Sequence, residues 1–183
     1  MSTRALVYES NGNPASVLSV VTYPPLPKPT GSSITVRHLL SPVNLSDINA
    51  IEGVYPRQPR PRQLNIGEQE RTLHIPGNEG LGEITDVGEG VEGLKKGDWV
   101  VFGKGQSGTW SSRQILEEED VIKLTRVFSD PLVGLVDHHL CLHLSNPILE
   151  IPGRSVNFRL IKNRDLLPYD RRDQRQAKGT PKS

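Results

Sequence analysis

A tyrosine that follows a short helical pattern is the residue with the clearest chemical use. Tyr55 ends the stretch NLSDINAIEGVY, residues 44–55, directly before a proline-rich segment. A phenol has an ordinary pKa near 10, so at neutral pH it is protonated and can donate a proton to a carbanion or an enolate. An aromatic residue after a helix stop is more commonly a packing residue, and the pattern alone leaves both interpretations open.

Two stretches match the G-x-G-x-x-G spacing of dinucleotide-binding loops, at residues 88–93 and 103–108. Such a loop must lie between a strand and a helix, so that the helix N-terminus faces the pyrophosphate. The first match runs into a turn and then a strand, and it places Glu89 and Glu92 where a phosphate would lie. The second runs into TWSS, which is too short and too β-prone to begin a helix. We predict turn glycines at both places and no cofactor-binding residue.

The residue types of a metal site occur together only at His138, His139, Cys141 and His143. His139 and His143 would share one face of a helix. The sequence fixes no acidic or histidine partner elsewhere, and the flanking residues are apolar. We therefore predict no metal site.

Composition excludes several classes of protein. The 183 residues carry a net charge of +1, too small to favour nucleic-acid binding, and no apolar run is long enough to span a membrane. The single cysteine rules out a disulfide framework and a four-cysteine zinc lobe.

The first part of the chain has the pattern of a mainly β domain. Short apolar runs at 5–8, 17–23, 34–40, 82–87 and 99–102 alternate with turn residues, which favours a barrel or a sandwich. A short helix is predicted at 45–52, with Ser46 as a possible cap and Gly53 as its stop. Residues 56–72 contain three prolines and are predicted to be an exposed loop.

These segments together resemble one protein family. The stretches that carry the resemblance are RALVYESNGNPASVL, SPVNLSDINAIEGVYP, IPGNEGLGEITDVGEGVEGLKKGDWVV and GTW. They are similar, in order, to the N-terminal half of medium-chain dehydrogenases/reductases, and within these to the mitochondrial trans-2-enoyl thioester reductases, which are enoyl-acyl-carrier-protein reductases of fatty acid synthesis. The similarity covers about residues 4–124, and NxSDINxIxGVYP is its specific part.

The resemblance implies a GroES-like barrel and an NADPH-dependent oxidoreductase of lipid metabolism. A hydride from NADPH would reach Cβ of a 2-enoyl thioester carried by acyl-carrier protein or coenzyme A, and Tyr55 would donate the proton. Asn44, Asp47 and Trp110 match positions near the active cleft and are assigned supporting roles. The resemblance also implies a homodimer in the mitochondrion. Met1-Ser2-Thr3 leads into the first strand without a recognisable transit peptide, so a cytoplasmic location is the alternative.

Zinc is not expected. Zinc alcohol dehydrogenases of the same superfamily have a cysteine in the region of residues 44–49 and a His-Glu pair where this chain has Asn78-Glu79. A zinc site needs Cys, His or carboxylate ligands, and the corresponding positions lack them.

The family's nucleotide-binding Rossmann domain should begin soon after Leu124, but residues 126–183 show no strand, glycine turn and helix in that order. We therefore divide the chain into a GroES-like domain at 1–125 and a C-terminal segment at 126–183 outside the family, irregular and partly disordered. A truncated form of this kind is expected to be inactive alone. Two alternatives remain: a zinc-free quinone or enone reductase of the same superfamily, and a partial barrel without enzymatic activity.

Overall fold

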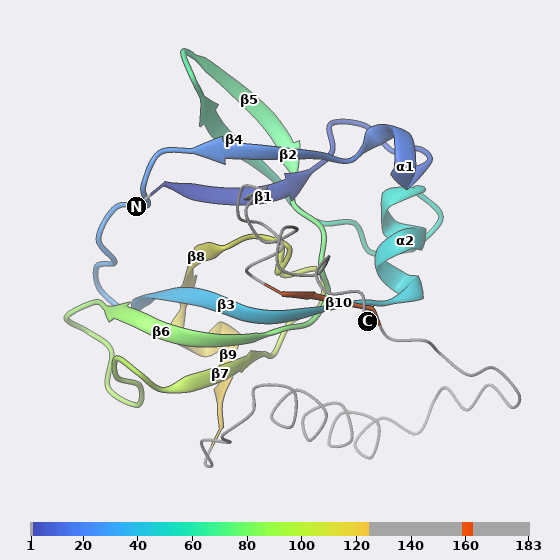
Figure 1. Cartoon of the computed structure of the whole chain (residues 1–183). Helices are drawn as coiled ribbons and strands as arrows, with labels where there is room; N and C mark the ends of the chain where they lie inside the picture. Colours follow the sequence, from blue (N-terminus) through green and yellow to red (C-terminus); the bar gives the residue numbers. More distant parts are fainter. Residues whose placement is uncertain (1, 125–158, 163–183) are drawn as a thin grey trace, which may run out of the picture.

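The structure, a computed structural model, describes residues 2–124 and 159–162 (Figure 1). Strands predominate, and the helices are short. In chain order the elements are β1 (Thr3–Val7), α1 (Pro14–Val17), β2 (Ser19–Tyr23), β3 (Ser33–Val43), α2 (Leu45–Ile51), β4 (Pro61–Ile66), β5 (Gln69–His74), β6 (Leu81–Val87), β7 (Trp99–Phe102), β8 (Arg113–Glu117), the 3-10 helix η1 (Glu118–Asp120), β9 (Val121–Lys123) and β10 (Arg159–Lys162). This mainly β architecture confirms the predicted fold class.

The largest sheet is built around β3, which is eleven residues long. Strand β6 pairs antiparallel with β3, and β7 and β9 continue the sheet beyond β6. Strand β8 pairs with residues 33–37 of β3, whereas β10 pairs with residues 40–43. Segments that are far apart in the chain therefore meet on one central strand.

Strand β1 connects the small β1–β2 sheet to the remainder of the barrel (Figure 1). The Leu6 N–H donates to the Trp110 carbonyl (2.9 Å), and the Ser112 N–H donates to the Arg4 carbonyl (2.7 Å). Tyr8 and His74 form an isolated antiparallel bridge at the end of β1. These bonds satisfy backbone groups that an edge strand would otherwise leave unpaired.

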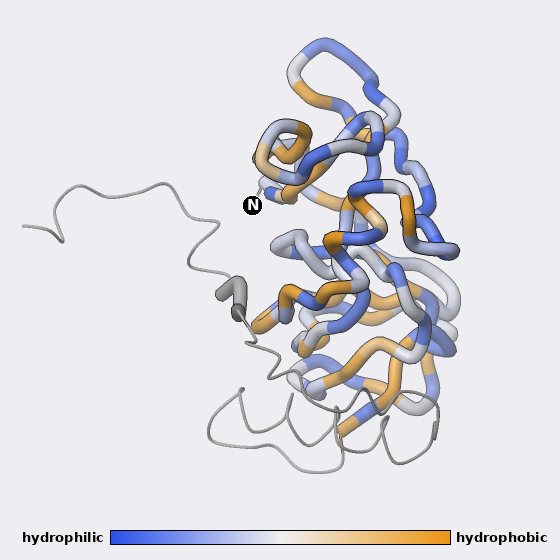
Figure 2. Tube along the Cα trace, turned by 90° about the vertical axis from the view of Figure 1, so that its right-hand side faces the viewer, coloured by the Kyte–Doolittle hydropathy of each residue, from blue (hydrophilic) through white to orange (hydrophobic). Residues whose placement is uncertain are grey.

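The apolar side chains form separate clusters rather than one large core. Figure 2 shows hydrophobic and hydrophilic stretches alternating along the trace, with a largely hydrophilic loop at the top of the view. One cluster lies between β1, β2 and the β4–β5 hairpin, and its buried members are Ala5, Val7, Val21, Tyr23, Leu64, Leu73 and Ile75. Two clusters lie on the large sheet, the first with Ile34, Val36, Ile84, Val100 and Phe102 and the second with Leu40, Leu81 and Val101. The fourth lies against α2 and consists of Tyr8, Ile51 and Trp110.

The prediction of an exposed loop over residues 56–72 is wrong, because most of this segment forms the β4–β5 hairpin. Leu64 and Leu73 are buried in the cluster shared with β1 and β2. Gly67 has a φ of 63° and begins a two-residue turn, which suits a tight hairpin. Pro61 is the first residue of its strand, a position that proline tolerates.

Two smaller expectations also need correction. The strand predicted at 17–23 begins only at Ser19, because Pro14–Val17 form α1, whose N-cap Asn13 accepts a hydrogen bond from the Ala15 N–H (3.0 Å). The N-cap of α2 is Asn44 and not Ser46. Strands β8, β9 and β10 were not predicted. In the described part of the chain, no helix is long and apolar enough to cross a membrane.

Candidate active site

Helix α2 and its stop fix the position of Tyr55. The Asn49 carbonyl accepts hydrogen bonds from the N–H groups of Val54 (2.9 Å) and Tyr55 (3.1 Å). The chain turns there through Gly53, whose φ of 83° favours glycine and confirms the predicted helix stop. The Gln58 side chain then donates to the Tyr55 carbonyl (2.8 Å). The Tyr55 backbone is therefore held from both sides.

The Tyr55 side chain itself is half-buried and belongs to none of the hydrophobic clusters. Among residues 2–124, its hydroxyl makes no hydrogen bond. A packing residue would contribute to a core cluster, and the described contacts show no such contribution. The ring thus keeps the partial exposure that a proton donor needs, and its role stays a prediction.

Asp47 is completely buried and holds two chain segments together. Its Oδ2 accepts the Asn44 N–H (2.8 Å), and its Oδ1 accepts the Asn78 N–H (2.8 Å). Burial raises the pKa of Asp47 to about 6, and the nearby Glu79 carboxylate acts in the same direction, while the two N–H donors oppose the rise. These contacts give Asp47 a positioning role at the start of α2.

Two asparagines extend this network. The Asn44 amide donates to Glu79 Oε2 (3.3 Å). The Asn78 amide donates to Ser46 Oγ (2.8 Å), and its Oδ1 accepts the Gln106 N–H (2.6 Å). Asn78 therefore links α2 to the loop before β8 with both ends of its side chain.

Trp110 is 2% exposed and packs with Tyr8 and Ile51. Its indole Nε1–H donates to the Pro42 carbonyl (3.1 Å). The tryptophan packs against Ile51 at the C-terminal end of α2, whereas Asn44 and Asp47 lie at the N-terminal end. No hydrogen bond within residues 2–124 joins the side chain of Tyr55 to any of these three residues, whose supporting roles remain predictions.

Neither G-x-G-x-x-G stretch begins a helix, as predicted. Residues 88–93 lie between β6 and β7, and residues 103–108 lie between β7 and β8. His138, His139, Cys141 and His143 lie outside the described residues. Within the described ranges, no three His, Cys, Asp or Glu side chains are grouped closely enough to bind a metal ion.

Sequence reasoning missed a cavity of about 590 Å³ beside Tyr55. Its lining residues come mainly from the segment after Tyr55 and from the loop after β7: Arg57, Gln58, Arg60, Arg62, Ile75, Lys104, Gly105, Gln106, Ser107, Leu116 and Asp120. The spacing Arg57, Arg60 and Arg62 was a usable signal, but it was read as part of a solvent-exposed loop. Tyr55 is not a lining residue; its neighbours Arg57 and Gln58 are.

Comparison with known proteins places this geometry in context. Residues 30–140 match the model of the alcohol dehydrogenase GroES-like domain. The mitochondrial enoyl-[acyl-carrier-protein] reductase of Yarrowia lipolytica is 40% identical over 121 residues, which cover 66% of this chain and 31% of that protein. The human mitochondrial enoyl-[acyl-carrier-protein] reductase is 36% identical over 121 residues, which cover 66% of this chain and 29% of that protein.

Solved structures show the same similarity. The complex of Etr1p with NADP and crotonyl-CoA is 36% identical, with a TM-score of 0.62, over 68% of this chain and 34% of that one. The Etr1p/Etr2p heterodimer, a mitochondrial 2-enoyl thioester reductase of Candida tropicalis, is 35% identical with a TM-score of 0.60, over 68% of this chain and 34% of that one. The chain spans about a third of the length of the relatives that it matches. It belongs to the alcohol dehydrogenase GroES-like domain family.

Proposed function

We propose that this chain is the thioester-side half of an NADPH-dependent 2-enoyl thioester reductase and that Tyr55 is its proton donor. The position of Tyr55 carries the proposal: its backbone is held by Asn49 and Gln58, its ring is half-buried, and its hydroxyl is uncommitted within residues 2–124. The names of the mitochondrial relatives support the reaction class.

The chemistry assigned to Tyr55 is the second half of a reduction. Hydride addition at Cβ of a 2-enoyl thioester moves an electron pair onto Cα and the thioester oxygen. The Tyr55 hydroxyl gives its proton to Cα, which completes the saturated acyl thioester, and water re-protonates the phenolate. A phenol suits this step because it is protonated at neutral pH and yet acidic enough for an enolate.

NADPH is the hydride donor implied by the relatives, and Etr1p was solved with NADP. The two glycine stretches do not fit the pyrophosphate of this cofactor. Neither stretch lies between a strand and a helix, and the first one carries Glu89 and Glu92, whose charges would repel a pyrophosphate. We therefore assign no residue of either stretch to the cofactor.

We further propose that this site works without zinc. The Asn78 carboxamide occupies the position at which zinc enzymes of the superfamily carry histidine, and its groups are used by Ser46 and Gln106. The Asn44 amide is likewise directed to Glu79. Amide side chains of this kind are poor zinc ligands, and their hydrogen bonds serve to hold α2 in place.

Asp47 contributes to the proposed function by positioning. Its two hydrogen bonds fix the start of α2 against residue 78, and α2 in turn fixes the start of the segment that carries Tyr55. By analogy with the relatives, we propose a mitochondrial location. The Etr1p/Etr2p heterodimer supports assembly as a dimer, which we propose to be a homodimer for this chain.

The experiment uses two proteins: the purified chain, and a chimera in which residues 1–124 replace the matching part of the Yarrowia relative. Each is incubated with NADPH and crotonyl-CoA, and the nicotinamide absorbance is followed. We expect turnover in the chimera and none in the chain alone. Tyr55→Phe in the chimera should lower kcat by about 100-fold, the usual size of a general-acid contribution.

Tyr8→Phe is the matched control, because the Tyr8 hydroxyl is buried without a hydrogen-bond partner and lies in the cluster with Ile51. It should leave kcat unchanged. Equal activity of Tyr55→Phe and Tyr8→Phe would exclude Tyr55 as the proton donor. A chimera that reduces quinones far better than crotonyl-CoA would favour the quinone reductase alternative.

A further inference from the structure

The arginine-lined cavity beside Tyr55 has no assigned function. Its walls come from the start of the β4–β5 hairpin, from residues 104–107 and from β8 and η1. These segments are far apart in the sequence and belong to different sheets. The cavity therefore forms only when the hairpin docks on the large sheet.

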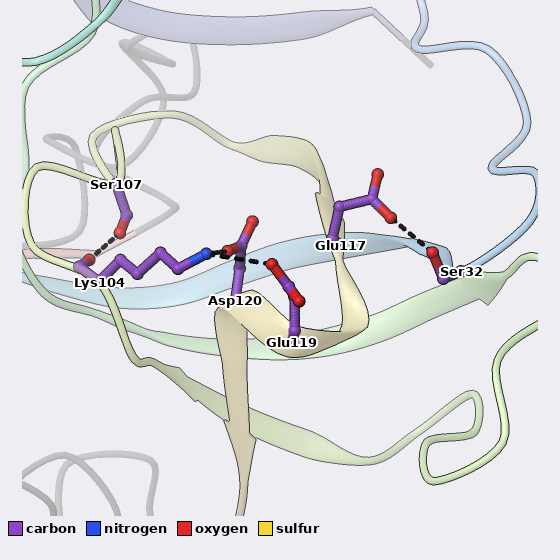
Figure 3. Close-up of polar contacts among 6 residues, drawn as sticks. All are labelled: Ser32, Lys104, Ser107, Glu117, Glu119 and Asp120. Carbon is purple, nitrogen blue, oxygen red and sulfur yellow. Dashed lines mark hydrogen bonds and ion pairs between the residues drawn. The ribbon is translucent and has the colours of Figure 1, made fainter.

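One wall of the cavity carries a lysine that is paired with two carboxylates. Lys104 forms ion pairs with Glu119 (3.4 Å) and Asp120, and Ser107 donates a hydrogen bond to the Lys104 carbonyl (Figure 3). Figure 3 shows the Lys104 side chain extended along this wall toward both carboxylates. The ammonium charge of Lys104 is thus neutralised within the protein.

The lining also carries arginines whose charges are not balanced. Arg62 is fixed by two neutral acceptors, the Ser107 carbonyl (3.0 Å) and the Gln114 side chain (3.0 Å). Arg57 and Arg60 are exposed, and within residues 2–124 neither forms an ion pair or a hydrogen bond. Together with Lys104 and its two carboxylate partners, the lining has a net charge of about +2.

Another lining residue, Gln106, is energetically unfavourable in two ways. Its φ of 60° is in the left-handed region, which an L side chain seldom adopts. Gln106 is 9% exposed, and both polar atoms of its amide are buried without a hydrogen-bond partner. Backbone strain and unpaired buried amides persist mainly where a site needs them, and Gln106 lines the cavity.

We propose that this cavity binds a small ligand through a phosphate group. The charge of the lining favours phosphate over a simple carboxylate. Guanidinium groups form paired hydrogen bonds to either anion, but a phosphate monoester carries about −1.5 to −2 charges, which matches the surplus of about +2 better than a single negative charge. The volume of about 590 Å³ also exceeds what an isolated ion requires and falls in the range of small-molecule sites.

The identity of the ligand rests on the proposed function. At the end of its pantetheine arm, an enoyl thioester has a phosphodiester on a carrier protein, with a single negative charge, or a pyrophosphate on coenzyme A, with two; a reduced nicotinamide dinucleotide phosphate has a pyrophosphate and a 2′-phosphate monoester. Each of these ligands would therefore present a phosphate group to the arginines of the cavity. Arg57 lies two residues after Tyr55, so the bound phosphate would anchor a ligand next to the proton donor.

Isothermal titration calorimetry on the full chain tests the proposal with two pairs of probes. Pantetheine is compared with 4′-phosphopantetheine, and NAD⁺ with NADP⁺; the members of each pair differ by one phosphate. We expect the phosphorylated member of one pair to bind at least about tenfold more tightly, and that pair identifies the source. Arg57→Gln and Arg60→Gln should each weaken this binding about tenfold, the loss typical of a charge-assisted hydrogen bond.

Arg71→Gln is the matched control, because Arg71 lies on β5, pairs with Glu9 (3.2 Å) and does not line the cavity. It changes the net charge equally and should leave binding unaltered. Equal affinity within both pairs, or equal losses in Arg57→Gln and Arg71→Gln, would overturn the proposal. The assay involves no turnover, so a failure here is distinguishable from a failure of Tyr55→Phe to lower kcat.

Discussion

The loops at residues 88–93 and 103–108 have the same spacing of glycines and different physical roles. In the first, a Cβ on Gly88 would overlap the Gly31 carbonyl oxygen and approach the Thr30 carbonyl carbon to 2.7 Å. In the second, a Cβ on Gly103 would have its nearest neighbour at 3.5 Å. Residue 88 therefore needs glycine for close backbone packing, whereas residue 103 has room for a methyl group in ordinary contact.

The surroundings of the two loops differ as well. The start of the first loop is held by backbone acceptors, since the Gly88 N–H donates to the Ser33 carbonyl (2.8 Å) and the Gly90 N–H donates to the Gly31 carbonyl (2.9 Å), and its end is held by the Glu118 carboxylate. Backbone carbonyls hold both ends of the second loop, but its middle is held by a side chain, because the Gln106 N–H donates to Asn78 Oδ1 (2.6 Å) and the Asn78 N–H in turn donates to Asp47. A shared glycine motif therefore says little about function until its neighbours are known.

The largest effect is expected for Gly88→Ala. The added methyl group must displace the backbone at residues 30–31, and overpacking of this kind costs about 3 kcal/mol. Urea unfolding should show a lower midpoint with an unchanged slope. A wild-type midpoint for Gly88→Ala would mean that the turn at residues 30–31 yields freely, which would remove the main difference between the two loops.

Two buried titratable groups lie around the second loop, and their effects on stability oppose each other. His38 Nδ1 lies 2.6 Å from the Ser111 carbonyl, so Nδ1 carries the proton and Nε2 accepts from the Gln114 amide (3.3 Å). Burial lowers the pKa of His38 from 6.5 to about 4, so acidification from pH 6.5 to 4 favours the unfolded state. The pKa of Asp47 is raised from 3.8 to about 6, so acidification from pH 6 to 4 favours the folded state at this residue.

Asp47→Asn should reveal how protonation of His38 lowers the stability of the fold. The variant loses one acceptor for a backbone N–H, which lowers stability at neutral pH by about 2 kcal/mol. Its stability should then fall by a further 2 kcal/mol or so between pH 6 and 4, where the wild type changes little. Urea unfolding at several pH values measures this, and parallel pH profiles of the two proteins would contradict it.

Nuclear magnetic resonance can localise the same effect. In the wild type, the chemical shift of the Gln106 N–H should change as Asp47 takes up its proton, with a midpoint near pH 6, because Asn78 is hydrogen-bonded to both residues. The Gly90 N–H, bonded to a backbone carbonyl, should show no step there.

Gln106→Gly is expected to increase stability. It relieves a left-handed backbone conformation and removes an unpaired buried amide, and the net gain should be about 1 kcal/mol after the entropy cost of glycine. Thermal unfolding followed by circular dichroism provides the measurement. A loss of stability would mean that the Gln106 amide has a favourable partner, and the strain argument for the cavity would fail.

The smallest effect is expected for Gly103→Ala, the matched control for Gly88→Ala. A methyl group there would make ordinary contact with the Asp120 carbonyl, so the stability should change by less than about 0.5 kcal/mol. A larger loss, measured by the same urea titration, would show that both loops are closely packed.

Local patterns predicted part of this molecule correctly. The stretch before Tyr55 forms a helix that ends at Gly53, and the runs at 34–40, 82–87 and 99–102 lie within strands. The hairpin at residues 61–74 was missed because its prolines and charges outweighed Leu64, Leu73 and the Gly67 turn, whose burial depends on β1 and β2. Strand β8 was missed because its pairing partner, β3, lies about 80 residues earlier.

The sequence by itself determined the strand-and-turn pattern, the helix that precedes Tyr55 and the similarity to the reductase family, because these depend on residues close together in the chain. Only the tertiary structure decided what surrounds them. Asp47 meets the Asn78 N–H across 31 positions, and Arg62 meets the Ser107 carbonyl across 45. Burial of Asp47 and the charge of the arginine-lined cavity arise from these distant contacts, since desolvation and charge balance depend on neighbours in space.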